Sequence, residues 1–151
     1  MRIAAVCLVL VWLAALSCYD IRERRLPNAL TLAGAGSILA VATLAGRGSS
    51  ALAGAAALTA IYVLVHGVAP GGMGAGDVKL AIGLGALTGC CGAGAWFLAA
   101  FAAPLLTALV GVVARLRGGA YGTAAAVPHG PSMCLASAVA IGLVLDGGAR
   151  I

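Results

Sequence analysis

Six long apolar runs, separated by short polar or glycine-rich turns, make up most of this sequence and limit what it can fold into. A helix needs about 20 predominantly apolar residues to cross the hydrocarbon core of a bilayer. The runs lie at residues 3–19, 29–45, 51–68, 77–91, 95–114 and 131–145. We therefore predict an all-α polytopic membrane protein with about six transmembrane helices, in a single membrane-embedded domain over residues 1–151. The fourth run is short, and glycines blur its boundary with the fifth.

The composition excludes an ordinary soluble domain. Hydrophobic residues make up 63% of the chain and charged residues only 9%, whereas soluble domains carry about 25% charged residues. The formal net charge is +5, but no Lys/Arg tract with interleaved aromatic residues is present, so we expect no nucleic-acid partner. In a membrane protein the basic residues instead report topology.

The basic residues are distributed unevenly over the predicted loops. The first, third and fifth loops hold Arg22, Arg24, Arg25, Lys79, Arg115 and Arg117. The other side holds only Arg2, Arg47 and Arg150. Because cytoplasmic loops carry an excess of Lys and Arg, we expect the odd-numbered loops in the cytoplasm and both termini outside.

The cysteines and small residues fit a packing role. None of the five cysteines forms a C-x-x-C pair, so we expect no metal site, and no cofactor motif is present. Adjacent Cys90 and Cys91, near a predicted outer turn, are interpreted as packing residues. Small residues at 53–57 and 83–86 predict close helix–helix contact. Residues 1–19 resemble a signal peptide, but the apolar runs that follow favour a retained first helix.

Two of the four acidic residues fall at predicted membrane–water boundaries on the same side. Asp20 ends the first apolar run, and Asp77 opens the fourth. An ionisable group held at a membrane segment indicates function. Two facing carboxyl groups could hydrolyse a peptide, because one can take a proton from water while the other donates one to the scissile carbonyl. Asp20 and Asp77 are therefore the candidate catalytic residues.

Simpler interpretations exist for each aspartate. Asp20 could form an ion pair with Arg24 on the same helix face, and Asp77 could merely cap its helix. A non-enzymatic membrane subunit or a small transporter could use the two carboxylates as a proton or cation relay. The glycines before Asp77 favour the peptidase, since Gly74 and Gly76 allow backbone conformations closed to other residues and leave space for a substrate strand.

Two further expectations concern the first residues of helices. Asn28 is a plausible N-cap for the second helix, and Pro131 suits the first turn of the last helix. His66 and His129 lie near the predicted cytoplasmic boundary. The interpretation favoured for both is an interfacial histidine satisfied by water or backbone, ahead of a catalytic or pH-sensing role.

Three motifs carry a resemblance to one family. Residues 74–80, Gly-Ala-Gly-Asp-Val-Lys-Leu, resemble the G-x-G-D motif of type IV prepilin peptidases. Residues 19–28 resemble that family's first-aspartate motif, in which basic residues and Pro-Asn follow the aspartate. Residues 128–131, Pro-His-Gly-Pro, resemble its late P-x-G-P motif, where His129 departs from the frequent phenylalanine. The motifs occur in the family's order and span nearly the whole chain.

The resemblance implies a membrane aspartyl endopeptidase that removes the basic leader from prepilins or pseudopilins. Asp20 and Asp77 would be catalytic, and the supporting motif residues would be Gly74, Gly76, Lys79, Pro27, Asn28, Gly130 and Pro131. The expected location is the bacterial cytoplasmic (inner) membrane, with the active site at the cytoplasmic face, in contact with lipid. The paired C-x-x-C motifs of the larger members are missing, so the chain resembles the short, peptidase-only branch of tight-adherence (Flp) pili, without N-methyltransferase activity.

Overall fold

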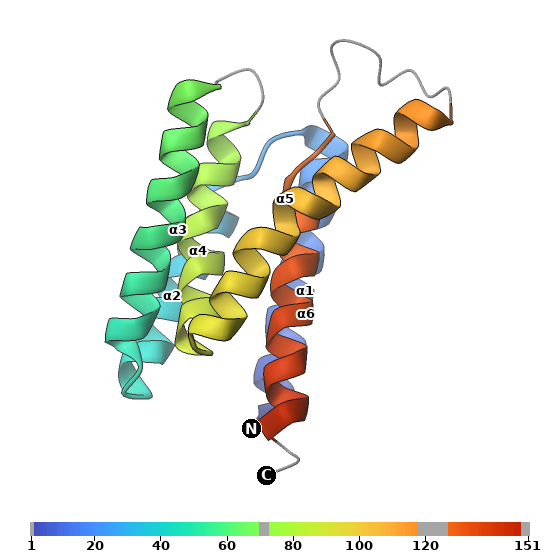
Figure 1. Cartoon of the computed structure of the whole chain (residues 1–151). Coiled ribbons are helices and arrows are strands. Elements are labelled where there is room, and N and C mark those ends of the chain that lie inside the picture. The colour runs from blue at the N-terminus through green and yellow to red at the C-terminus, as the bar shows by residue number, and fades with distance from the viewer. Residues whose placement is uncertain (1, 70–72, 118–126, 149–151) are drawn as a thin grey trace.

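The structure, a computed structural model, describes residues 2–69, 73–117 and 127–148, and these ranges contain six α-helices and no strand (Figure 1). The helices are α1 (Arg2–Glu23), α2 (Asn28–Leu44), α3 (Gly48–Val68), α4 (Ala75–Cys90), α5 (Ala93–Leu116) and α6 (Gly130–Gly148). The predicted all-α class is confirmed. Parts of two predicted loops (residues 70–72 and 118–119) and Arg150 lie outside the described residues.

Four of the helices, α1, α3, α5 and α6, are long and apolar enough to cross a membrane. Helix α2 has 17 residues and α4 has 16, so both are shorter than the roughly 20 residues of a full span. Large apolar side chains such as Leu8 and Phe101 face outward, as expected where lipid covers the surface. The chain is therefore a multi-pass membrane protein.

The helix ends differ from the predicted ones in detail. Helix α1 continues three residues past Asp20 and ends where Arg24 adopts a φ of 49°. Pro27 occupies the N-cap position of α2 with an extended backbone, so the prediction that Asn28 caps this helix is wrong. Proline fits this position because it has no N–H to leave unsatisfied. Pro131 lies in the first turn of α6, as predicted.

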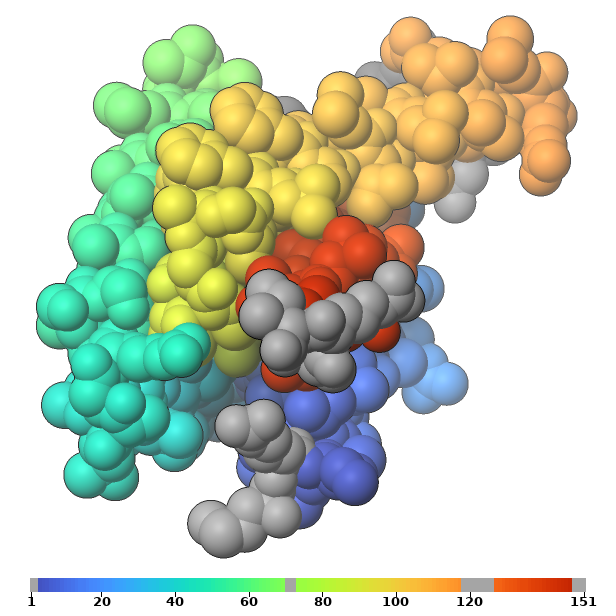
Figure 2. Space-filling model, turned by 60° about the horizontal axis from the view of Figure 1, so that its bottom comes forward, coloured from blue at the N-terminus to red at the C-terminus, as the bar shows by residue number. Residues whose placement is uncertain are grey.

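The helices form two groups. In the first half, α4 packs closely along α3, and α2 packs against both. In the second half, α6 packs between α1 and α5. Figures 1 and 2 both show the C-terminal part of α5 standing out from the rest of the molecule. We call these groups the α2–α3–α4 half and the α1–α5–α6 half.

Glycines set the close approach of α3 and α4, and this confirms the predicted packing seams. A Cβ atom on Gly85 would lie 3.0 Å from the Cα of Ala55, and one on Gly89 would lie 2.7 Å from the carbonyl oxygen of Ser50. Neither position has room for a side chain without moving a backbone. Small residues of this kind let membrane helices gain van der Waals contact, since lipid offers no hydrophobic force to join them.

The two halves meet around a shared core and two tryptophans. Leu16 of α1, Leu84 of α4 and Met133 of α6 are almost fully buried together. Trp12 of α1 donates its indole N–H to the carbonyl of Leu30 on α2 at 3.0 Å. On the other side, an equivalent 3.0 Å bond runs from Trp96 of α5 to α3. Buried indole N–H groups usually find such partners, so these bonds fix how the halves meet.

Candidate active site

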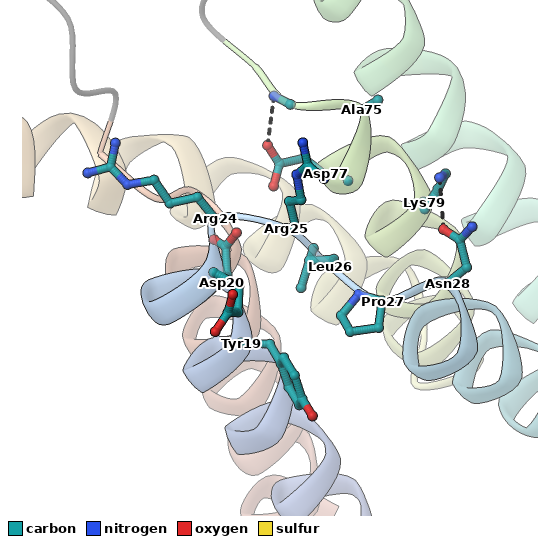
Figure 3. A pocket seen from close by; sticks show the side chains of 13 residues that line it. Tyr19, Asp20, Arg24, Arg25, Leu26, Pro27, Asn28, Ala75, Asp77 and Lys79 are labelled. Carbon is teal, nitrogen blue, oxygen red and sulfur yellow. Dashed lines mark hydrogen bonds between the residues drawn. The ribbon is translucent and has the colours of Figure 1, made fainter.

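Asp20 and Asp77 line one pocket of about 780 Å³ between the end of α1 and the start of α4 (Figure 3). Five other motif residues predicted from the sequence line the same pocket: Gly74, Gly76, Lys79, Pro27 and Asn28. The structure thus brings together seven of the nine predicted site residues around one cavity. The other two, Gly130 and Pro131, begin α6, and the backbone N–H of Gly130 contacts Asp20.

Asp20 lies near the end of α1 and is only 8% exposed. Its carboxylate Oδ2 accepts a hydrogen bond of 3.0 Å from the backbone N–H of Gly130, a residue 110 positions away. A Cβ atom at position 130 would lie 2.6 Å from the same oxygen. Glycine is therefore required there, because any side chain would push the carboxylate away from the N–H that holds it.

Asp77 is the third residue of α4 and is 7% exposed. Its Oδ2 accepts a 3.1 Å hydrogen bond from the N–H of Gly74, the N-cap residue. The Asp77 N–H in turn donates to the Gly74 carbonyl at 3.1 Å. The bond from the Gly74 N–H to the Asp77 side chain is the one that an acidic residue supplies in a capping box. The helix dipole also favours negative charge at this end of α4.

The two glycines before Asp77 do not act through unusual backbone angles, contrary to expectation. Gly74 has a φ of −74° and a ψ of 148°, which any residue can adopt. Gly76 lies within the first turn of α4, and a Cβ there would meet Leu26 at 3.5 Å, an ordinary contact. Their remaining contribution is open space, because both line the pocket without filling it.

Lys79 and Asn28 join the first two motifs directly. The Nζ of Lys79 on α4 donates to the Oδ1 of Asn28 at 2.8 Å (Figure 3). Asn28 begins α2, so this bond fixes the first turn of α2 to the second turn of α4. The bond places a lysine and an asparagine from the two motifs in direct contact beside the same pocket.

His129 has two side-chain partners that the sequence did not indicate. Its Nε2 lies 2.8 Å from the hydroxyl of Tyr62 on α3, and its Nδ1 lies 2.7 Å from the hydroxyl of Thr107 on α5. The prediction that water or backbone satisfies His129 is therefore wrong. Burial lowers the pKa of His129 below its ordinary value. The same prediction is confirmed for His66, whose Nδ1 contacts the carbonyl of Met73 at 2.8 Å.

The rim of the pocket is mainly basic. Arg24, Arg25 and Lys79 line it together with one acidic rim residue, Glu23. Within the described ranges, no group of three or more His, Cys, Asp or Glu side chains could hold a metal ion. What the arrangement offers is two buried carboxylates, each held through one oxygen by a glycine N–H, facing a water-accessible cavity.

A family model described as the type IV leader peptidase family matches residues 7–112. The match includes Asp20, Asp77 and every pocket residue, and it ends before the Pro128–Pro131 motif. Comparisons with curated proteins and with solved structures gave no match.

Proposed function

Because the chain belongs to the type IV leader peptidase family, we propose that it is an aspartyl endopeptidase that uses Asp20 and Asp77 as its catalytic pair. Its substrate is a prepilin or pseudopilin, from which it removes the basic leader. Cleavage takes place at the cytoplasmic face of the bacterial inner membrane. The chain acts as one domain, and the activity is peptide hydrolysis without N-methyl transfer.

One observation carries the proposal. Asp20 and Asp77 are the only buried acidic residues in the described part of the chain, and they line one pocket from opposite halves of the molecule. Burying two carboxylates is costly unless they are hydrogen-bonded. Each accepts a bond from a glycine N–H through Oδ2, and both side chains line the pocket. A purely structural role does not explain an open cavity between two such groups.

The chemistry follows from two carboxyl groups that share one proton. The ionised carboxylate draws a proton from a water molecule as the water oxygen attacks the scissile carbonyl carbon. The protonated carboxyl donates a hydrogen bond to the carbonyl oxygen, and the C–N bond then breaks as the amine leaves with a proton. Like charges at one site favour this singly protonated state, so titration belongs to the pair.

The membrane orients the substrate. A prepilin carries a basic leader followed by a long apolar helix, and that helix can lie in the bilayer beside the enzyme. The scissile bond is then held at the depth of the pocket, which removes much of the entropy of orientation. The arginines after Asp20 suit contact with anionic lipid headgroups at the same boundary.

Co-expression with candidate prepilins tests the proposal. We expect the wild type to shorten the prepilin, and Asp20→Asn and Asp77→Asn each to abolish the shortening at equal protein level. Asp146→Asn in α6 is the matched control, since it makes the same chemical change far along the chain from the pocket, and it should leave processing intact. Shortening that survives either pocket substitution would rule out the catalytic pair.

A further inference from the structure

A side chain of helix α3, Tyr62, contacts His129, the residue that precedes Gly130 and its bond to Asp20. The Tyr62 hydroxyl lies 2.8 Å from His129 Nε2, and the two rings lie 5.6 Å apart between centroids. His129 is followed directly by Gly130, whose N–H binds Asp20. Tyr62 is only 5% exposed, so its position is fixed by the surrounding core. The contact joins the α2–α3–α4 half to the loop that enters α6.

A second side chain of α3, His66, contacts Met73, the residue that precedes Gly74 and its bond to Asp77. One turn after Tyr62, the Nδ1 of His66 lies 2.8 Å from the carbonyl oxygen of Met73. A carbonyl only accepts hydrogen bonds, so Nδ1 carries the proton and donates it. Met73 is followed by Gly74, whose N–H binds Asp77. Residues four apart lie on one helix face, so one face of α3 contacts the neighbours of both glycines.

The hydrogen bonds around His129 have a defined direction. The Thr107 hydroxyl also lies 3.1 Å from the carbonyl of Ala103, which can only accept. A hydroxyl has one proton, so Thr107 donates it to Ala103 and accepts from the Nδ1–H of His129 at 2.7 Å. The Nε2 of the neutral imidazole is then an acceptor, and Tyr62 donates to it. Both histidines thus carry their proton on Nδ1.

We propose that Tyr62 and His66 are positioning residues through which α3 sets the relative position of the two carboxylates. Tyr62 acts through His129 and Gly130 on Asp20, and His66 acts through Met73 and Gly74 on Asp77. The arrangement itself is independent of the reaction, whereas its effect on catalysis rests on the proposed peptidase function.

Helix α3 is suited to this role because it is the helix most closely packed against α4. At the glycine seam, formed by Gly54, Gly85 and Gly89, backbone atoms of α3 and α4 lie against one another, so α3 cannot move toward or along α4 without disturbing these contacts. Tyr62 then links this rigid pair to the other half of the molecule, where Asp20 lies. Without such a link, the spacing between the carboxylates would depend only on how the two halves pack.

Substitutions that remove a single hydrogen bond test the effect of the α3 contacts on catalysis. Tyr62→Phe removes only the hydroxyl, and we expect kcat to fall on the order of tenfold with KM unchanged, since misplacement by a fraction of an ångström costs rate rather than binding. His66→Leu should act similarly, and His66→Asn, which keeps a donor near the Nδ1 position, should restore most of the rate. The matched control is Thr88→Val, which removes a fully buried hydroxyl on α4 at the far end from Asp77. Equal losses in Tyr62→Phe and Thr88→Val would overturn the proposal.

A spectroscopic test keeps this proposal separate from the peptidase function. The chain contains only two histidines, so ¹⁵N-histidine NMR in nanodiscs reports both imidazoles, and the His66→Asn variant assigns them. We expect the proton on Nδ1 in both, and Tyr62→Phe should shift only the Nε2 resonance of His129. A proton on Nε2 of His129, or no response to Tyr62→Phe, would contradict the proposal even if the enzyme cleaves. The expected spectra from a protein that cleaves no prepilin would uphold the α3 contacts and reject the proposed function alone.

Discussion

The α2–α3–α4 half and the α1–α5–α6 half each supply one aspartate, but they hold it in different ways. Asp77 is bound by Gly74, three residues earlier on the same helix start. Asp20 is bound by Gly130, which is 110 residues away on another helix. The first arrangement forms as soon as α4 forms, whereas the second exists only when α1 and α6 are assembled. The site is therefore locally determined on one side and depends on tertiary structure on the other.

The packing of the two halves differs in the same sense. Glycines bring the backbones of α3 and α4 nearly into contact, whereas the C-terminal part of α5 extends away from the other helices (Figures 1 and 2). A rigid half carrying Asp77 and a looser half carrying Asp20 make the approach of the two carboxylates sensitive to contacts between the halves. The following substitutions separate these contributions.

Among substitutions outside the two aspartates, the largest effect is expected at the long-range contact between Gly130 and Asp20. Gly130→Ala places a Cβ 2.6 Å from Oδ2 of Asp20, so the carboxylate must move and the rate of cleavage should fall by about 10²-fold, as for a misplacement near 1 Å. Gly142→Ala on the same helix is the control, because a Cβ there meets nothing within 4 Å. Cleavage assays on purified protein compare them, and equal activity would contradict the role given to Gly130.

A glycine-to-alanine change should be tolerated better at the start of α4, beside Asp77. Gly76→Ala introduces a Cβ at an ordinary 3.5 Å from Leu26, so we expect folding to be unchanged and the rate to fall only about 2–10-fold, through the lost space for substrate. Comparing the two alanine variants in one assay sharpens the distinction between the sites. A loss of rate in Gly76→Ala as large as that in Gly130→Ala would contradict the proposed difference between the two aspartate sites.

Packing between α3 and α4 affects stability more than chemistry. Gly85→Ala would bring a Cβ within 3.0 Å of the Cα of Ala55, and overpacking of this kind costs about 1–3 kcal/mol of unfolding free energy. Gly94→Ala, where nothing lies within 4 Å, should be neutral or slightly stabilising because alanine favours helix. Thermal unfolding in detergent measures both, and equal midpoints would argue against the glycine seam.

A smaller effect is expected for the bond between Lys79 and Asn28. Lys79→Met keeps the length of the side chain and removes the 2.8 Å hydrogen bond. Because the bond is exposed and α2 is held by other contacts, we expect a loss of about 0.5 kcal/mol, at the low end for a hydrogen bond. Asn28→Ala should match it, and the double variant should lose no more than either single one.

The smallest effect is a dependence of stability on pH from His129. Burial depresses its pKa, so between the folded value and the ordinary value of about 6.5 the unfolded chain binds a proton that the folded chain does not. This contribution is therefore complete above pH 6.5 and is lost as the pH falls toward the folded pKa. His129→Gln should flatten the dependence of the unfolding free energy on pH in that range, measured by thermal unfolding in detergent at a series of pH values. Identical curves for wild type and His129→Gln would contradict the buried, neutral state.

The same division between local and long-range contacts explains what the sequence could predict. Hydrophobic runs predicted the six helices, because membrane spans are encoded in consecutive residues. The glycine-rich pattern before Asp77 predicted the start of α4 to within two residues for the same reason. Asn28 was predicted as a cap from its type alone, but Pro27 takes that position and Lys79 recruits the asparagine.

The long-range contacts had no such signal. No sequence rule pairs Asp20 with an N–H 110 residues away, although the family resemblance had indicated Gly130. Tyr62 and Thr107 lie inside apolar runs, where a single polar residue is not distinctive. A useful signal would have been that each carries a hydroxyl that must find a partner once its helix is packed.

The central claim is that Asp20 and Asp77 act as one unit across the two halves. Single-turnover cleavage of a purified prepilin in nanodiscs, comparing Asp20→Asn, Asp77→Asn and the double variant, tests it most directly. Residues that act together are strongly non-additive, so each single variant should lose at least about 10³-fold, and the double variant should lose no more than either one. A single variant that retains near wild-type cleavage, or losses that multiply in the double variant, would contradict the account.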